Sequence, residues 1–220
     1  MTTKKLALPD AMSLGESYAH VAKIQIRRRL ALWLYGAAVV AVLPFVGSHW
    51  HAGSVMHETI EQVGTLLIIA AILGRAWCSL YIGGRKSSEL VDTGPYSVSR
   101  NPLYLFSMLG VVGVGAQSGS LLLGPLLCLT VWAIFRRVIG HEEALLLKVF
   151  GTRFSRYCER VPRFGPNPRA WVSTDSLVVS PGAVWRTVRD AIPFLLVPPV
   201  FELIDWLQAT KAVSVMFRLY

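Results

Sequence analysis

The chain has 220 residues, of which 53% are hydrophobic and 16% charged, and its mean hydropathy is +0.48. This composition is too apolar for an ordinary soluble domain and favours an integral-membrane protein. The net charge of +9 could suggest a nucleic-acid partner, but the basic residues gather at the ends of apolar segments, as in membrane proteins that face anionic lipid. We therefore expect membrane lipids around the chain and no bound nucleic acid.

Two membrane-length apolar segments are predicted before residue 84. Residues 30–47 follow the basic run Arg27-Arg28-Arg29, and a run of about 18 residues is just long enough to span a bilayer. Residues 60–83 form the second segment, which contains Arg75. A charged side chain within a span is costly unless it faces the bundle interior or water. Arg75 is therefore a weak candidate for a site.

A helical hairpin is predicted next. Residues 103–117 and 121–135 are apolar, the turn between them is Ser118-Gly119-Ser120, and Arg136-Arg137 closes the second helix. The glycines of the first helix are expected to permit close helix packing, as small residues do in membranes.

The chain after the hairpin is predicted to be helical but not regular. Residues 140–160 form an amphipathic, basic region broken near Gly151, and residues 191–207 form an apolar helix interrupted by prolines. This last helix is either interfacial or a kinked fifth span. We expect an all-α membrane bundle with four transmembrane helices and this C-terminal helix. Three regions follow: a cytosolic N-terminal segment (1–29), a membrane core (30–169) and a helical tail (170–220).

The distribution of lysine and arginine predicts the orientation in the membrane. The N-terminus, the loop over residues 85–100 and the region after Arg136 are basic, whereas residues 48–59 and 118–120 contain neither residue. Because basic loops stay cytoplasmic, the N-terminus and the 85–100 loop are expected to face the cytosol across the inner cell membrane.

The loop between the second and third apolar segments carries an unusual set of polar residues. It reads Gly94-Pro95-Tyr96 and then Arg100-Asn101-Pro102-Leu103-Tyr104, and the pair Glu142-Glu143 follows the hairpin. Such a loop has little reason to lie at membrane depth unless it lines a site. The order G-x-Y, R-N-P-x-Y, hydrophobic hairpin, E-E and a final F-G…Y…V-P resembles one family. This family is that of the integral-membrane methyltransferases, typified by isoprenylcysteine carboxyl methyltransferase and the phospholipid N-methyltransferases.

This resemblance implies S-adenosylmethionine as cofactor and a lipophilic or small methyl acceptor with a reactive carboxylate, amine or thiol. Helix-start N–H groups can take the cofactor carboxylate, a glutamate can bind its ribose hydroxyls or ammonium, and tyrosine rings favour a nearby cation. No general base is assigned. Carried over by position, the implied cofactor-binding residues are Ser88, Glu89, Leu90, Val91, Tyr96, Asn101, Pro102, Leu103, Tyr104 and Glu142.

The chain departs from the family pattern at three positions. Asn101 stands where histidine is usual, and it can form hydrogen bonds but cannot carry charge. Phe106 replaces a common glycine and is expected to narrow the opening of the site. The substrate-binding arginine of the eukaryotic enzymes falls at Val138, so the neighbouring Arg137, about 100° away around a helix, is the candidate for binding substrate.

A metal site is not expected from the sequence. His49, His51 and His57 lie in the loop on the side opposite the motif, where the favoured interpretation is interfacial polar residues. Glu143, one position after Glu142, should tolerate substitution better if it is only a solvated neighbour.

Two other functions remain open. A sterol-reductase-like membrane enzyme would need a larger site and more spans than 220 residues readily provide. A catalytically inactive membrane adaptor of the same fold would be expected to have lost Tyr96, Tyr104 or Glu142, and the chain has all three.

Overall fold

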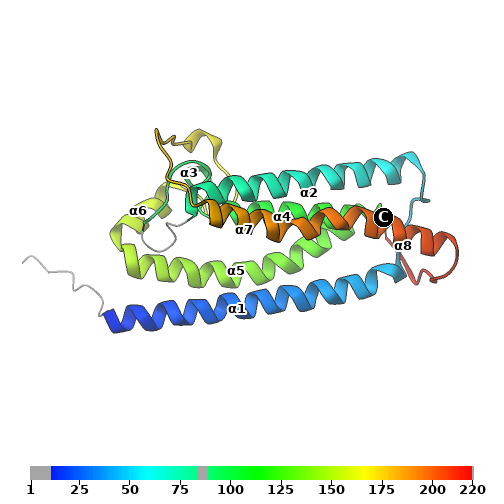
Figure 1. The fold of residues 1–220 in the computed structure, drawn as a ribbon, viewed down its shortest axis with the longest axis horizontal. Coiled ribbons are helices and arrows are strands. Elements are labelled where there is room, and N and C mark those ends of the chain that lie inside the picture. Colours follow the sequence, from blue (N-terminus) through cyan, green and yellow to red (C-terminus); the bar gives the residue numbers. More distant parts are fainter. Residues whose placement is uncertain (1–10, 84–88, 220) are drawn as a thin grey trace, which may run out of the picture.

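The protein is an elongated bundle of long helices that run roughly antiparallel to one another (Figure 1). The computed structural model describes residues 11–83 and 89–219. The helices of the bundle are α1 (Ala11–Val42), α2 (Val55–Ile82), α4 (Pro102–Ala116), α5 (Leu123–Phe150), α7 (Pro181–Ala191) and α8 (Val197–Ala209). Short elements connect them: η1 (Leu43–Phe45), β1 (Val46–Ser48), α3 (Pro95–Val98), α6 (Thr152–Arg160), η2 (Pro168–Ala170), η3 (Ile192–Leu196) and β2 (Phe217–Leu219).

The all-α membrane bundle expected from the sequence is confirmed. By length and composition, three described helical segments are long and apolar enough to cross a membrane: Ala22–Phe45, Val55–Ile82 and Leu123–Phe150. The fourth expected span, α4, is apolar but has only 15 residues. At 1.5 Å per residue it is about 22 Å long, which is less than the roughly 30 Å hydrocarbon core of a bilayer.

Helices α2 and α4 form the closest helix pair of the bundle, and glycines make this approach possible. A Cβ atom at Gly113 would lie 2.6 Å from the carbonyl oxygen of Gly64, and one at Gly64 would lie 2.8 Å from that of Gly113. Backbone therefore meets backbone at this crossing, as is common for small residues in membrane helices. The packing role predicted for the glycines of the third apolar segment is confirmed.

The hairpin between α4 and α5 is present, but α5 does not end at Arg136-Arg137. The helix has 28 residues, from Leu123 to Phe150, and ends where Gly151 adopts a positive φ of 51°. Arginine is a good helix former, so the basic pair marks a change of environment along the helix and not its end. The prediction of a break near Gly151 is confirmed, and Glu142 lies within α5.

The boundary placed at residues 29 and 30 does not coincide with a structural break. Helix α1 runs without interruption from Ala11 to Val42 and packs along α5. Residues on both sides of this boundary therefore face the same bundle.

The C-terminal region runs the length of the bundle as α7, η3 and α8 (Figure 1). At one end, the hydroxyls of Thr187 in α7 and Ser79 in α2 lie 2.8 Å apart. At the other end, the Gln208 side chain donates to the carbonyl oxygens of Pro44 and Val46. The path bends at η3, between α7 and α8. The last residues then form a parallel β1–β2 pair, in which Val46 is opposite Phe217.

Candidate active site

One cavity of about 730 Å³ lies within the bundle, between α1, α2, α4, α5 and α7 and the loop before α4. Its volume falls within the range of small-molecule sites. Nine of the residues that sequence reasoning assigned to cofactor binding line this cavity: Glu89, Leu90, Val91, Tyr96, Asn101, Pro102, Leu103, Tyr104 and Glu142. The tenth, Ser88, lies outside the described residues.

The cavity is polar at one end and mostly apolar along the rest of its length, where Arg75 and Ser107 are among the lining residues. The loop residues, Glu142 and Gln25 form the polar end. From there the lining follows α4 from Pro102 to Val114, a rise of about 18 Å at 1.5 Å per residue. The walls of this apolar part include Val39, Ile68, Ala71, Val111, Val114, Leu127 and Val131. The cavity can therefore accept two ligands, one with a polar part at the polar end and a lipophilic one along the apolar walls.

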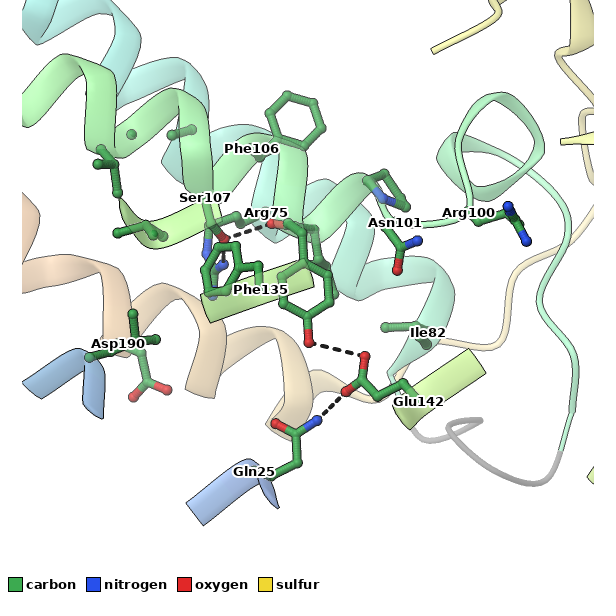
Figure 2. Close-up of a pocket in the computed structure, with 18 of the residues that line it drawn as sticks. Gln25, Arg75, Ile82, Arg100, Asn101, Phe106, Ser107, Phe135, Glu142 and Asp190 are labelled. Atoms are coloured by element: carbon green, nitrogen blue, oxygen red, sulfur yellow. Dashed lines mark hydrogen bonds between the residues drawn. The ribbon is translucent and has the colours of Figure 1, made fainter. Parts of the chain in front are cut away.

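Glu142 joins three helices at the polar end. The Tyr104 hydroxyl donates a hydrogen bond to Glu142 Oε2 at 3.0 Å, and the Gln25 side-chain amide donates to Oε1 (Figure 2). The Tyr104 ring packs edge-on against Phe135, with the ring centroids 4.7 Å apart. These contacts fix the carboxylate of Glu142 and the ring of Tyr104 beside the same cavity.

Tyr96 is held by its backbone, while its side chain faces the cavity. The Tyr157 hydroxyl donates to the Tyr96 carbonyl oxygen at 2.7 Å. Only 5% of Tyr96 is exposed, and its buried hydroxyl has no hydrogen-bond partner among the described residues. Burial raises the pKa of Tyr96 well above its ordinary value, so this hydroxyl is a neutral donor at physiological pH.

The start of α4 is organised by a cluster centred on Glu143. Arg163 donates to Glu143 Oε2 through Nε at 2.9 Å and through a terminal nitrogen, and Arg100 lies 3.5 Å from Oε1. The Asn101 side chain donates to the Arg163 carbonyl oxygen and to Glu143, and it does not cap α4. Glu143 is therefore a structural ion-pair partner. The interpretation of Glu143 as only a solvated neighbour is wrong, because its side chain is 15% exposed.

The comparisons with known proteins agree with this arrangement. The family model described as phospholipid methyltransferase matches residues 60–153. The nickel-cobalt-cadmium resistance protein NccN of Alcaligenes xylosoxydans xylosoxydans is 34% identical over 84% of this chain and 86% of its own length. This chain belongs to the phospholipid methyltransferase family.

Other relatives belong to two groups. The cobalt-zinc-cadmium resistance protein CzcN of Cupriavidus metallidurans is 34% identical over 81% of this chain and 82% of its own length. Protein-S-isoprenylcysteine O-methyltransferase B of Arabidopsis thaliana is 26% identical over 67% of this chain and 79% of its own length. No solved structure matches the chain significantly. The Arabidopsis relative is thus named as an O-methyltransferase, which agrees with the sequence resemblance.

Within this family member, Arg75 is the cation that reaches the middle of the cavity. It extends from α2 and donates to the Ser107 hydroxyl on α4 (Figure 2). Phe106, the family departure next to Ser107, packs over Gly74, where an added Cβ atom would lie 2.2 Å from the ring. Both residues line the cavity. Arg75, a weak site candidate from the sequence, therefore lies beside the candidate site, and the narrowing expected of Phe106 stays a prediction.

The structure does not bring Arg137 to the cavity. Arg137 is exposed on α5, and the buried residue at the position of the family's substrate arginine is Val138, with 5% exposure. The sequence in turn missed Gln25 on α1 and Asp190 and Phe194 in the C-terminal region, which also line the cavity. No local motif marks these three residues, because they arrive through helix packing.

A second polar cluster lies at the opposite end of α2. His57 Nε2 lies 3.2 Å from Glu61 Oε1 and 3.1 Å from Asp205 Oδ2, and His57 is only 3% exposed. The sequence interpretation of His57 as an interfacial polar residue is therefore wrong. Its side chain is buried against the hairpin turn, because an added Cβ at Gly119 would lie 2.1 Å from the imidazole.

Proposed function

We propose that the protein is an S-adenosylmethionine-dependent methyltransferase of the inner membrane, with a lipophilic acceptor. One observation carries this proposal: the nine described motif residues line one cavity, and this cavity continues into an apolar part. In this proposal the cofactor enters from the cytosol and binds at the polar end. The acceptor enters from the bilayer and binds in the apolar part. The three regions of the chain then act as one unit, since α1 and α7 complete the cavity walls.

Two observations support a fit between these residues and the cofactor. The Tyr96 hydroxyl is buried at the cavity without a partner among the described residues, which is expensive unless a ligand accepts its hydrogen bond. The start of α4 is not capped by the Asn101 side chain. Pro102 has no N–H and the Tyr104 N–H donates to the Asn101 carbonyl oxygen, so the Leu103 N–H and the helix dipole are what this helix start offers to a carboxylate. Glu142 would bind ribose hydroxyls or the ammonium group, and Tyr104 would face the cation.

The residues of the chain contribute mainly positioning and a dry environment. When bound, S-adenosylmethionine supplies a sulfonium methyl group that the acceptor nucleophile displaces, with the electron pair of the broken carbon–sulfur bond remaining on sulfur. The apolar walls exclude water and align the acceptor with that methyl group. Arg75 lies beside the apolar part and would bind an electronegative or anionic acceptor group. Charge is neutralised during transfer to an anion, so a low dielectric favours the transition state.

The test of this proposal is a methyl-transfer assay in membranes. Membranes containing the wild-type protein and the Glu142→Gln variant at equal amounts are incubated with S-adenosylmethionine labelled in its methyl group. At a cofactor concentration below the wild-type dissociation constant, label should enter an organic-extractable or protein-bound acceptor at least about tenfold more slowly with Glu142→Gln than with the wild type. Calorimetry on the purified protein with S-adenosylmethionine and S-adenosylhomocysteine should show binding of both. Absence of binding by folded protein would refute the proposal and favour the inactive adaptor.

The names of two bacterial relatives suggest a cellular setting for this activity. NccN and CzcN are named for resistance to nickel, cobalt, zinc or cadmium, and they align with more than four-fifths of this chain. We infer that this protein contributes to tolerance of divalent metals through its methyl-transfer site. A deletion strain should regain growth on cobalt or cadmium with the wild-type gene and not with Glu142→Gln. Equal rescue by both genes would separate metal tolerance from methyl transfer.

A further inference from the structure

We propose that His57, Glu61 and Asp205 form a binding site for one divalent transition-metal ion, which joins α2 to α8. The ligand atoms His57 Nε2, Glu61 Oε1 and Asp205 Oδ2 all lie within 4.8 Å of one another. This site is separate from the methyl-transfer cavity. None of the three ligand residues lines that cavity, and Ile68, the lining residue of α2 nearest to them in the sequence, is seven positions after Glu61, which is about 10 Å along a helix. The inference therefore does not depend on the proposed function.

The geometry of the three atoms suits a small metal ion. The nitrogen lies 3.2 Å from one carboxylate oxygen and 3.1 Å from the other. In a tetrahedral zinc site with bonds of about 2.0–2.2 Å, ligand atoms are roughly 3.3–3.6 Å apart, so small adjustments would seat an ion among them. One imidazole and two carboxylates provide nitrogen and oxygen ligands, which suit Zn²⁺, Co²⁺ or Ni²⁺ and leave a fourth position for water.

Burial and charge also favour a cation at this place. The side-chain exposure is 4% for His57, 14% for Glu61 and 21% for Asp205. The charged side chains that act most strongly on Glu61 are His57, Asp205, Glu202 and Glu58, and none of these is a lysine or arginine. Glu61 and Asp205 are thus two partly buried carboxylates beside one histidine, whereas Glu58 and Glu202 are exposed. Partly buried carboxylates without a matching positive charge are unfavourable, and a divalent ion would neutralise both.

The imidazole itself is free to act as a ligand. His57 Nδ1 is buried and has no hydrogen-bond partner among the described residues, so no described contact fixes the ring proton on Nε2. If Nε2 carries the proton, a single N–H faces two carboxylate oxygens while the Nδ1 lone pair is buried without a donor. If Nδ1 carries it, that N–H is buried without an acceptor among the described residues and the Nε2 lone pair faces both carboxylates. A metal ion bound at Nε2 would remove the repulsion between this lone pair and the carboxylates.

The experiment measures metal binding to the full chain in detergent, purified with a tag that contains no histidine and stripped with a chelator. Titration with Zn²⁺ should give one site per chain, and Co²⁺ should give the intense visible absorption of a tetrahedral complex. Asp205→Asn keeps a hydrogen-bond acceptor for His57 but removes the anionic ligand, so it should weaken Zn²⁺ binding at least tenfold. His57→Gln should abolish the Co²⁺ spectrum.

A matched control distinguishes direct ligation from a general negative potential. Glu58→Gln removes one negative charge from the exposed start of the same helix and leaves the three ligands in place. It should change Zn²⁺ affinity less than threefold. Thermal unfolding without metal shows whether each variant remains folded. The proposal is overturned if the wild type binds no Zn²⁺, or if Asp205→Asn and Glu58→Gln weaken binding equally.

Discussion

Glu142→Gln tests the assignment of the polar end of the cavity with little change of shape. The Glu142 carboxylate accepts from Tyr104 at 3.0 Å and from Gln25. A glutamine at this position keeps one acceptor oxygen for Tyr104, and the Gln25 amide can turn to accept from the new amide group. The contacts between α1, α4 and α5 are therefore retained, and the negative charge is what the variant loses.

The expected loss follows from the value of one charge-assisted hydrogen bond to the cofactor. Such a bond contributes about 1.5–3 kcal/mol, and 1.4 kcal/mol corresponds to a factor of about ten in affinity. Glu142→Gln should therefore raise the dissociation constant of S-adenosylmethionine roughly 10- to 100-fold. Isothermal titration calorimetry in detergent measures this change, and the thermal midpoint should remain near that of the wild type.

Glu143→Gln is the matched control because it neutralises the adjacent carboxylate. Glu143 pairs with Arg163 and Arg100, and Asn101 donates to it. Its loss should lower the free energy of unfolding by roughly 1.5–3 kcal/mol, because partners that are partly buried lose a charged acceptor. Its effect on cofactor affinity should be smaller than that of Glu142→Gln. Equal cofactor affinity in Glu142→Gln and the wild type would refute the assignment of Glu142.

Substitutions at three further positions, with one control, examine the cavity wall and the helix packing. Tyr104→Phe removes the hydroxyl that contacts Glu142 and Tyr104→Ala also removes the ring, so a larger loss of cofactor affinity in Tyr104→Ala, measured by calorimetry, would indicate stacking on the cation. Arg75→Gln should raise the acceptor KM about tenfold or more in the methyl-transfer assay and leave cofactor affinity unchanged, whereas an unchanged acceptor KM would remove Arg75 from acceptor binding. Gly113→Ala should lower the free energy of unfolding by about 1–3 kcal/mol, because its Cβ would lie 2.6 Å from the Gly64 carbonyl oxygen; Gly140→Ala meets no atom within 4 Å and should not destabilise the protein in the same thermal assay.

The sequence predicted those parts of the fold and site that depend on local pattern. Apolar length and basic flanks located the helices of the bundle, and the fixed order of the loop motif and Glu142 located nine residues around one cavity. Helix ends were less certain, because arginines at 136 and 137 are compatible with a continuing helix and α5 extends to Phe150.

Residues whose roles come from distant partners could not be predicted in this way. His57 and Asp205 are 148 positions apart, and Glu143 and Arg163 are 20 apart, yet each pair is in contact. From the sequence alone, His57 in a polar loop and Glu143 next to a site residue are expected to be solvated. Their burial follows only from the positions of the elements that cover them. Gln25 reaches Glu142 for the same reason, through the packing of α1 on α5.

The pairing of β1 with β2 has a consequence for the order in which the bundle can be completed. Residues 46–48 leave the ribosome early, whereas their partners, residues 217–219, are synthesised 171 positions later. The pairing cannot form until all the helices between the two strands have been synthesised, so this contact comes late in the assembly of the bundle. Until then, the C-terminal helices lack this anchor, and deletion of residues 217–219 would remove it permanently.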